Sequence, residues 1–462
     1  MSVKYLSTFK EENQMKKYLY LLLIGAFSVS MLFMGIGCKE EVSIPEKEVV
    51  VEEVAEEEVA EEPFPSTISG EVDCISYYTA GVALDAFNEV YENFKEDYPN
   101  IELTIIPKSV DEIITVIQTN LVSSDPVDCF FWWADERQQP YVEQGLIAPL
   151  TDIFDSTNYD ELAPGVYSYS RFRGFGDTPY NVPYNNMTHA MWYNVAKFEE
   201  AGIKSAPETW DEFLEVCEKL LDAGIYPLGR NKEPVGHPCF MYLEKFWQRT
   251  LPDNSYRVGL KTGDLSADTP EMRKALSYFD ELLPYWHPDS ISNGYVETYQ
   301  GFARGDFAMQ MMGNWIVGTY EVDMELIPFV DYDMFMFPEI DPNVPKMETG
   351  STNVIVLTTT GKDNKAAQAW VAYWTRPETQ KIFCSKMGQL PAIASVEVEN
   401  PMLAKHLELL IGRELFHEMA LPAAIDTDIC LLIEERAWGS ITTDEFVERW
   451  DKIFADFKEV SE

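Results

Sequence analysis

The fold class is decided by residues 188–224, THAMWYNVAKFEEAGIKSAPETWDEFLEVCEKLLDAG. In this stretch a strand pattern is followed by a helix pattern. Residues 188–194 form a short run rich in aromatic side chains, which predicts a strand. Thr209 then precedes Glu212 by three residues, the capping-box spacing that starts a helix, and Gly224 marks the end of that helix. Strands that alternate with helices are typical of α/β proteins.

The same alternation continues on both sides of this stretch. A helix is predicted before Pro99, because one apolar stripe recurs at helical spacing at Leu84, Phe87, Val90, Tyr91 and Phe94. Further strands are predicted at 101–106, 127–133, 307–312 and 353–358, and further helices at 364–374 and 442–460. We therefore expect an α/β fold.

The first 37 residues have the layout of a secretory signal. Lys16 and Lys17 precede an apolar stretch from Leu19 to Phe33, and small residues follow at 35–37. Met15 is the expected initiator, since it directly precedes the charged start. An uncleaved membrane anchor is the alternative, because the apolar stretch approaches the roughly 20 residues that a spanning helix needs.

Cys38 directly follows the small residues. This arrangement resembles the lipobox of bacterial lipoproteins, which implies that Cys38 is lipidated and becomes the first residue of the mature chain. The leucine that usually stands three positions before the cysteine is replaced here by Gly35.

Residues 38–66 are predicted to form an acidic, disordered tether. Eleven Glu and two Lys lie between Lys39 and Ser66, a one-sign block with few aromatic residues. The whole chain carries a formal net charge of −43. Such a surface repels phosphate backbones, so we expect no nucleic-acid partner. Lipid at Cys38 would hold the acidic chain at a membrane.

The body from residue 67 to 462 is too long for one ordinary hydrophobic core, so we expect two lobes. Its six cysteines, Cys74, Cys129, Cys217, Cys239, Cys384 and Cys430, form no CxxC and no zinc spacing. We therefore expect no metal site. One disulfide is possible outside the cytoplasm, but the spacing selects no pair.

Catalytic motifs give no constellation that singles out an enzyme. The five histidines lie in no HExxH motif and beside no GxSxG motif, and GKDNK at 361–365 lacks the glycine spacing of a phosphate loop. Carboxylates are abundant, so a pair for glycoside hydrolysis can be hidden anywhere in the chain. We expect a protein that is not an enzyme and needs no cofactor.

Aromatic residues beside polar ones are the clearest sign of a binding site. Trp132 and Trp133 end a predicted strand just before Asp135. A sugar offers apolar CH faces to aromatic rings and a rim of hydroxyls to polar side chains. Neighbouring strand residues point to opposite faces, so one Trp is expected in the core. We assign Trp133 and Asp135 to the site.

Five blocks resemble, in the same order, the family 1 extracellular solute-binding proteins of ABC importers, the maltose-binding-protein-like group. They are VDCFFWWADERQQPYVEQGLIAPLTD at 127–152, NVPYNNMTHAMWYNVAKFEEAGIKSAPETWDEF at 181–213, FARGDFAMQMMGNW at 302–315, METGSTNVIVL at 347–357 and GQLPAIASV at 388–396. The resemblance spans roughly residues 70–460. It implies a two-lobe periplasmic-binding-protein-like fold of type II, with a hinge and a ligand cleft between the lobes.

The resemblance also implies site residues. A Gly313-Asn314 turn would present Trp315 to stack on a sugar ring, and Arg304-Gly305-Asp306 would then be part of a structural turn and no adhesion motif. The other positions implied to touch ligand are Tyr78, Thr79, Trp133, Asp135, Asn185, Glu348, Gly350 and Ser351. Trp192, Trp210, Trp247 and Trp370 are expected to pack in the interior.

The implied lobes comprise residues 67–182 with about 339–390, and residues 183–338 with about 391–462. Crossovers are expected near Val182-Pro183, Phe337-Pro338 and Leu390-Pro391, about which the lobes would close on the ligand.

The function expected is that of a monomeric, lipid-anchored binding protein outside the cytoplasm, in the periplasm or on the outer face of the membrane. It would deliver a small-molecule solute, most simply a carbohydrate, to the ABC permease. Two alternatives remain open: a secreted carbohydrate-active enzyme, and a binding protein for a non-sugar solute such as a polyamine or a metal ion.

Overall fold

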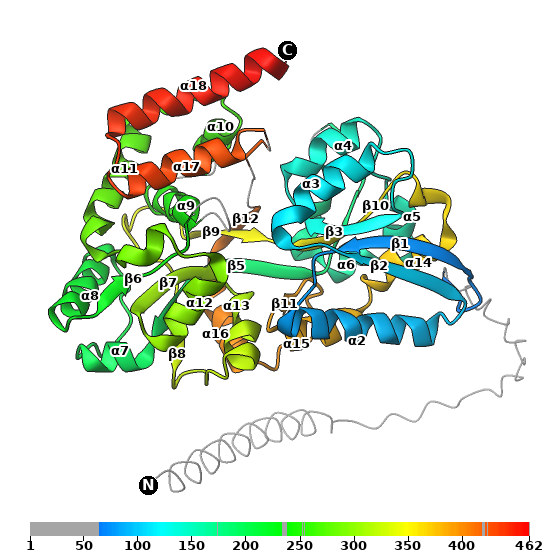
Figure 1. Ribbon diagram of the computed structural model, residues 1–462, viewed down its shortest axis with the longest axis horizontal. Helices are drawn as coiled ribbons and strands as arrows, with labels where there is room; N and C mark the ends of the chain where they lie inside the picture. The colour runs from blue at the N-terminus through cyan, green and yellow to red at the C-terminus, as the bar shows by residue number, and fades with distance from the viewer. Residues whose placement is uncertain are drawn as a thin grey trace, which may run out of the picture. The chain divides into compact units, whose positions relative to one another are not determined.

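The computed structural model describes residues 64–172, 174–232, 238–251, 253, 255–417, 421–422 and 424–461 (Figure 1). The predicted signal, Cys38 and the tether up to residue 63 lie outside these residues. Phe64 packs against the first core, and its carbonyl accepts a hydrogen bond of 2.9 Å from the Tyr98 hydroxyl. The packed body therefore reaches back at least to Phe64, ahead of the predicted start at Thr67.

The first lobe is built on a five-stranded sheet with the order β2-β1-β3-β10-β4. Strand β1 is parallel to β2 and β3, and β10 is antiparallel to β3 and β4. The strands are β1 (Gly70–Ser76), β2 (Ile101–Pro107), β3 (Cys129–Trp133), β4 (Val182–Pro183) and β10 (Asn353–Leu357). The predicted strands at 101–106, 127–133 and 353–358 are thereby confirmed.

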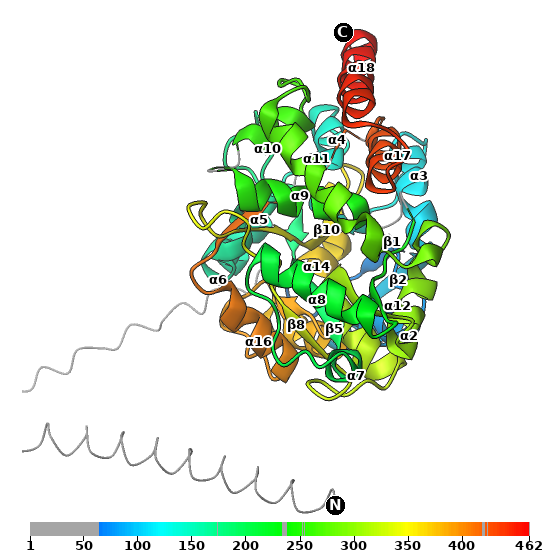
Figure 2. The same ribbon diagram turned by 90° about the vertical axis from the view of Figure 1, so that its left-hand side faces the viewer.

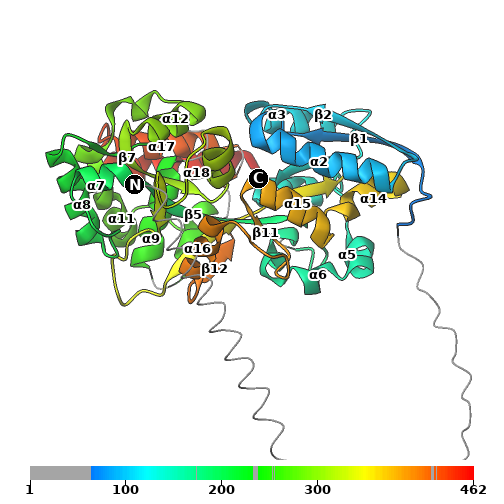
Figure 3. The ribbon, with the colours of Figure 1, turned by 90° about the horizontal axis from the view of Figure 1, so that it is seen from below.

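Helices enclose this sheet, and α2 and α15 lie side by side (Figure 3). Their bounds are α2 (Gly81–Asp97), α3 (Val110–Leu121), α4 (Gln139–Glu143), α5 (Thr151–Thr157), α6 (Tyr159–Leu162), α14 (Lys365–Tyr373) and α15 (Pro377–Met387). The predicted stripe of α2 is confirmed at Phe87, Val90 and Phe94, whereas Leu84 is half-buried.

The second lobe is built on a seven-stranded sheet around β5 (Asn185–Asn194). The remaining strands are β6 (Tyr226–Leu228), β7 (Phe307–Gly313), β8 (Tyr332–Phe335), β9 (Met347–Ser351), β11 (Leu390–Pro391) and β12 (Glu414–His417). Alternate residues of β5 enter different cores, since Met191 packs in one cluster while Ala190 and Trp192 pack in another. The sheet is therefore covered by apolar side chains on both faces.

Helix α8 begins where the capping box predicted. The Thr209 hydroxyl accepts a hydrogen bond from the Glu212 backbone N–H, and the Glu212 carboxylate accepts one from the Thr209 backbone N–H. Helices α11, α17 and α18 pack together in the same lobe (Figure 2). The helices of the second lobe are α7 (Val195–Glu200), α8 (Trp210–Asp222), α9 (Pro238–Thr250), α10 (Ser255–Lys261), α11 (Pro270–Leu282), α12 (Tyr295–Arg304), α13 (Ile316–Gly318), α16 (Pro401–Leu410), α17 (Asp426–Ala437) and α18 (Thr443–Ser461).

The chain passes between the sheets at three places. It leaves β4 for β5 at Tyr184 and leaves β9 for β10 at Thr352, and β11 pairs with the first residues of β5. The crossover predicted near Phe337-Pro338 is wrong, because β8 and β9 both pair with β5 and Phe337 is buried in the second core. Residues up to Ser351 therefore belong to the second lobe.

Trp192, Trp210, Trp247 and Trp370 are buried, as predicted. The Arg-Gly-Asp tripeptide ends α12: Gly305 takes a left-handed conformation at φ 76°, and Arg304 forms an ion pair of 2.6 Å with Asp306. The six cysteines of the described residues are all buried and form no disulfide with one another, so the disulfide left open by the sequence is absent there. No helix within the described ranges has the length and apolar character to cross a membrane.

Candidate functional site

The first-lobe half of the candidate site lies where two neighbouring parallel strands end. Strand β1 ends at Ser76 and β3 ends at Trp133, so the rings of Tyr77 and Trp133 stack with centroids 5.0 Å apart and an interplanar angle of 21°. Trp132 points into the core, while Trp133 is half-buried. This is the division of the Trp pair that strand alternation predicted.

An ion pair adjoins this aromatic platform. The Arg137 Nε donates hydrogen bonds of 2.9 and 3.0 Å to the two carboxylate oxygens of Asp135, and the guanidinium lies 5.6 Å from the Trp133 ring centroid. Asp135 is buried, so Arg137 fixes its carboxylate at the end of β3. The arrangement offers an aromatic surface for CH groups and fixed polar atoms for hydroxyls.

Tyr78 and Thr79 differ in placement. Tyr78 is buried; its hydroxyl bonds to that of Tyr184 and accepts a hydrogen bond of 3.3 Å from Asn353 Nδ2. Burial raises the pKa of Tyr78 well above its usual range. Thr79 is exposed.

Tyr77, which the sequence analysis missed, is the tyrosine that stacks on Trp133, and its place directly after β1 was the available signal.

The second-lobe half centres on Trp315, directly after the Gly313-Asn314 turn. A Cβ at position 313 would lie 1.8 Å from Trp315 Cζ3, so only glycine leaves room for the indole there. The indole Nε1 donates a hydrogen bond of 2.7 Å to the Tyr295 hydroxyl. Trp315 is half-buried, so its ring is held firmly and still reaches the surface.

His189 is the second-lobe residue that sequence reasoning missed. Its ring meets the Trp315 ring edge to face with centroids 5.5 Å apart, and its buried Nδ1 has no hydrogen-bond partner. Burial, with a further contribution from the charge of Lys245, lowers the pKa of His189 to about 3. A neutral imidazole therefore lies against the indole at physiological pH. Its neighbour on the other face of β5, Thr188, bonds to His406.

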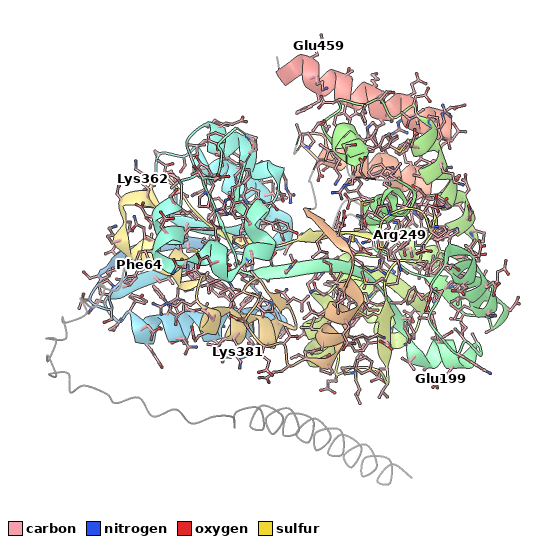
Figure 4. The ribbon with its side chains drawn as sticks, turned by 180° about the vertical axis from the view of Figure 1, so that it is seen from behind. Phe64, Glu199, Arg249, Lys362, Lys381 and Glu459 are labelled. Carbon is pink, nitrogen blue, oxygen red and sulfur yellow. The ribbon has the colours of Figure 1, made fainter. Side chains whose placement is uncertain are left out.

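Glu348 does not fit the ligand-binding role expected of it. It is fully buried in β9, and its carboxylate forms ion pairs with Lys245 and Arg249 of α9 and a hydrogen bond of 2.9 Å with Arg413 (Figure 4 labels Arg249). Burial alone would raise the pKa of Glu348, but the charges of Arg249, Lys245 and Arg413 lower it to about 2. This carboxylate joins α9 to β9.

Asn185 is also held in the interior by hydrogen bonds to other parts of the protein. It is fully buried, its Oδ1 accepts a hydrogen bond of 2.7 Å from the Asn353 backbone N–H, and its Nδ2 donates one of 2.6 Å to Gln389 Oε1. The Thr352 hydroxyl donates to the Asn185 carbonyl at 2.6 Å. Asn185 therefore connects the three crossovers to one another.

The remaining expected residues follow Glu348 along β9. Gly350 is buried, and a Cβ there would lie 2.6 Å from the Tyr169 hydroxyl of the first lobe. Ser351 is half-buried and pairs with Met187 of β5. Both residues thus lie beside the Thr352 crossover.

Two groups of residues result from this geometry. Tyr77, Trp133 and Asp135 come together on the first lobe, and Trp315 with His189 on the second, while Tyr78, Asn185 and Glu348 are held in the interior. Within the part of the chain that the structure describes, no three His, Cys, Asp or Glu side chains are grouped to hold a metal ion.

Known proteins resemble this chain along most of its length. Residues 80–381 match the model of a family described as bacterial extracellular solute-binding protein. An uncharacterized ABC transporter extracellular-binding protein of Pyrococcus horikoshii is 25% identical over 91% of this chain and 92% of its own length. A probable sugar-binding periplasmic protein of Mesorhizobium japonicum is 24% identical over 55% of this chain and 60% of its own length.

A solved structure has the same fold. A chitin oligosaccharide binding protein superposes on this chain with a TM-score of 0.75 at 18% identity, covering 84% of this chain and 98% of that one. The expected two-lobe α/β fold is thereby confirmed.

Proposed function

The chain belongs to the bacterial extracellular solute-binding protein family, and on this premise we propose that it is the saccharide-binding component of an ABC importer. The observation that carries the choice of a saccharide is the pair of aromatic surfaces at strand ends, Trp133 with Tyr77 and Trp315 with His189. Each surface lies beside fixed polar groups, and the Trp residue of each surface is only half-buried. Relatives named for sugar binding support the same choice.

The proposed mechanism is closure of the two lobes about the three crossovers. Asn185 joins these crossovers by hydrogen bonds, so they would bend as a unit. A saccharide that contacts Trp133 on one lobe and Trp315 on the other more closely in the closed arrangement would shift the equilibrium towards that arrangement. The closed lobes then present a composite surface to the permease.

Catalysis by Glu348, which the sequence placed in the site, has less support. Glycoside hydrolysis needs one carboxylic acid whose pKa is raised so that it can protonate the leaving group. At Glu348 burial raises the pKa, but three neighbouring cations outweigh burial and lower the pKa to about 2. The ion pairs favour binding over hydrolysis.

The proposal places the protein outside the cytoplasm. The signal-like residues 1–37, Cys38 and the acidic segment that follows favour a lipid anchor on a tether. Intact mass spectrometry of the membrane-extracted protein tests this: a mature chain beginning at acylated Cys38 supports the anchor, and a chain retaining residues 15–37 contradicts it.

A thermal-shift screen tests the function. Purified protein is heated with mono- and oligosaccharides, polyamines and divalent metal ions, since selective binding stabilises the native state by mass action. Stabilisation by one saccharide class that is lost in Trp315→Ala supports the proposal. Stabilisation by an amine or a metal ion alone would retain a solute-binding role and overturn the saccharide.

A further inference from the structure

A cavity of about 280 Å³ lies at the third crossover, apart from the aromatic surfaces described above. Cys384 and Ser385 of α15 line it from the first lobe, and Leu403 of α16 lines it from the second. Gln389 and Pro391 of the crossover itself complete the wall. Residues of both lobes and of the segment that joins them therefore line the cavity, which is partly open to solvent.

Gln389 lines this cavity and carries one amide group whose two ends have different roles. The Asn185 Oδ1 accepts from the Asn353 backbone N–H, which fixes the orientation of the Asn185 amide and makes its Nδ2 the donor to Gln389. Gln389 must therefore accept through Oε1, which leaves its Nε2 turned away from Asn185. Gln389 is only 3% exposed, and no atom of the described residues accepts a hydrogen bond from this Nε2.

The other lining residues define which ligand fits. Apolar surface comes from Pro391, Val396, Val398 and Leu403, and acceptor oxygens come from the exposed carboxylates of Glu397 and Glu399. No lysine or arginine is among the lining residues, and the one cation of the described residues that pairs with a lining carboxylate, Lys381 at 3.5 Å from Glu399, stands outside the lining, so the pocket wall itself offers an anion no positive charge. A hydroxyl group both accepts, as from the Gln389 Nε2, and donates, as to a carboxylate.

We propose that this hinge pocket is a second binding site, which takes a small uncharged polyhydroxylated molecule of monosaccharide size or less. Its volume lies just below the ~300–1,000 Å³ of typical ligand pockets, which suits a molecule of a few carbon atoms. The CH groups of the polyol contact the apolar wall, and its hydroxyls satisfy Gln389 and the carboxylates. The site is independent of the saccharide proposed for the aromatic surfaces.

Ligand binding in the pocket is coupled to the hinge through the hydrogen bonds of Gln389. The same amide accepts the hydrogen bond of Asn185, which in turn holds Thr352 and Asn353 at the β9–β10 crossover. A rotation of α16 relative to α15 would change the pocket, because residues of both helices line it. A bound polyol therefore shifts the equilibrium between lobe arrangements, and the solute and the polyol alter each other's affinity by the same factor.

Ligand-observed NMR titration of the full chain with glycerol, erythritol and xylitol tests the site. Val398→Trp fills the pocket, and Gln389→Glu keeps an oxygen for Asn185 but replaces the free donor with an acceptor. Both variants are expected to weaken polyol binding at least ten-fold. Val460→Trp, at a position 88% exposed on α18, is the matched control and is expected to bind as the native chain does.

Three results would overturn the proposal: no binding of any polyol to the native chain, equal binding by Val398→Trp, or stronger binding of 1,4-diaminobutane than of the polyols. Trp315→Ala separates this proposal from the saccharide site. Polyol binding that survives in that variant keeps the hinge pocket even if the saccharide proposal fails, and polyol binding lost with Trp315 assigns the polyol to the aromatic surface and overturns the pocket.

Discussion

Replacing Glu348 with Gln separates a structural role for this residue from the ligand-binding role that the sequence suggested. The substitution removes the carboxylate that pairs with Lys245, Arg249 and Arg413, and leaves buried cations without compensation. Breaking a buried pair in this way costs about 3–5 kcal/mol. We expect the free energy of unfolding at pH 7 to fall by that amount.

The pH dependence of unfolding gives a second estimate of how much the Glu348 carboxylate stabilises the fold. The folded pKa of Glu348 is about 2, below the ordinary value of 4.5, so its stabilisation is fully present above pH 4.5 and is lost as the pH falls towards 2. The difference corresponds to roughly 3 kcal/mol, at about 1.4 kcal/mol per pKa unit. The gap in stability between the native chain and Glu348→Gln should therefore narrow between pH 5 and pH 2.

Denaturant unfolding followed by tryptophan fluorescence at pH 7 and at pH 3 measures both effects. Glu339→Gln is the control, since Glu339 pairs at 3.8 Å with an exposed Lys346 and should cost less than about 1 kcal/mol. If Glu348→Gln unfolds at the native denaturant concentration and loses solute binding instead, the structural account of Glu348 is refuted.

Three further predictions concern single positions. Gly313→Ala should displace the Trp315 ring, because the alanine Cβ would lie 1.8 Å from the indole. We expect this displacement to weaken solute binding about ten-fold in calorimetric titration. Unchanged affinity would contradict the placement of Trp315 in the site. Thr209→Ala removes the N-cap of α8 and should lower the unfolding free energy by about 1 kcal/mol without changing solute affinity. His189 has a folded pKa of about 3, so solute affinity should be flat from pH 5 to 8. The stability that comes from burying the neutral imidazole should be lost as the pH falls from 6.5 towards 3. A step in affinity near pH 6.5, absent in His189→Gln, would show that His189 titrates in the site.

Local signals in the sequence predicted much of the fold. The capping box at Thr209, the stripe ending at Phe94 and the short apolar strands are set by residues within a few positions of one another, so period and capping reveal them. The crossover near Phe337 was misplaced because β8 and β9 are both short and pair with the same strand, β5. A pattern along the chain does not say which strand lies beside which.

The candidate site was predicted less well, for a related reason. Trp133 ends a predicted strand and Trp315 follows another, so their positions at strand ends could be inferred. Glu348 and Asn185 look like ligand-binding residues in isolation, but their partners Lys245 and Gln389 lie far away in sequence. Only the folded chain shows that these polar groups are already satisfied in the interior.

The most direct test of the central claim is a calorimetric titration with the saccharide that best stabilises the protein, followed by recovery and mass analysis of that saccharide. We expect one saccharide bound per chain, recovery of the saccharide intact, and loss of the binding heat in Trp315→Ala. Recovery of hydrolysed saccharide, or binding heat that Trp315→Ala leaves undiminished, would contradict it.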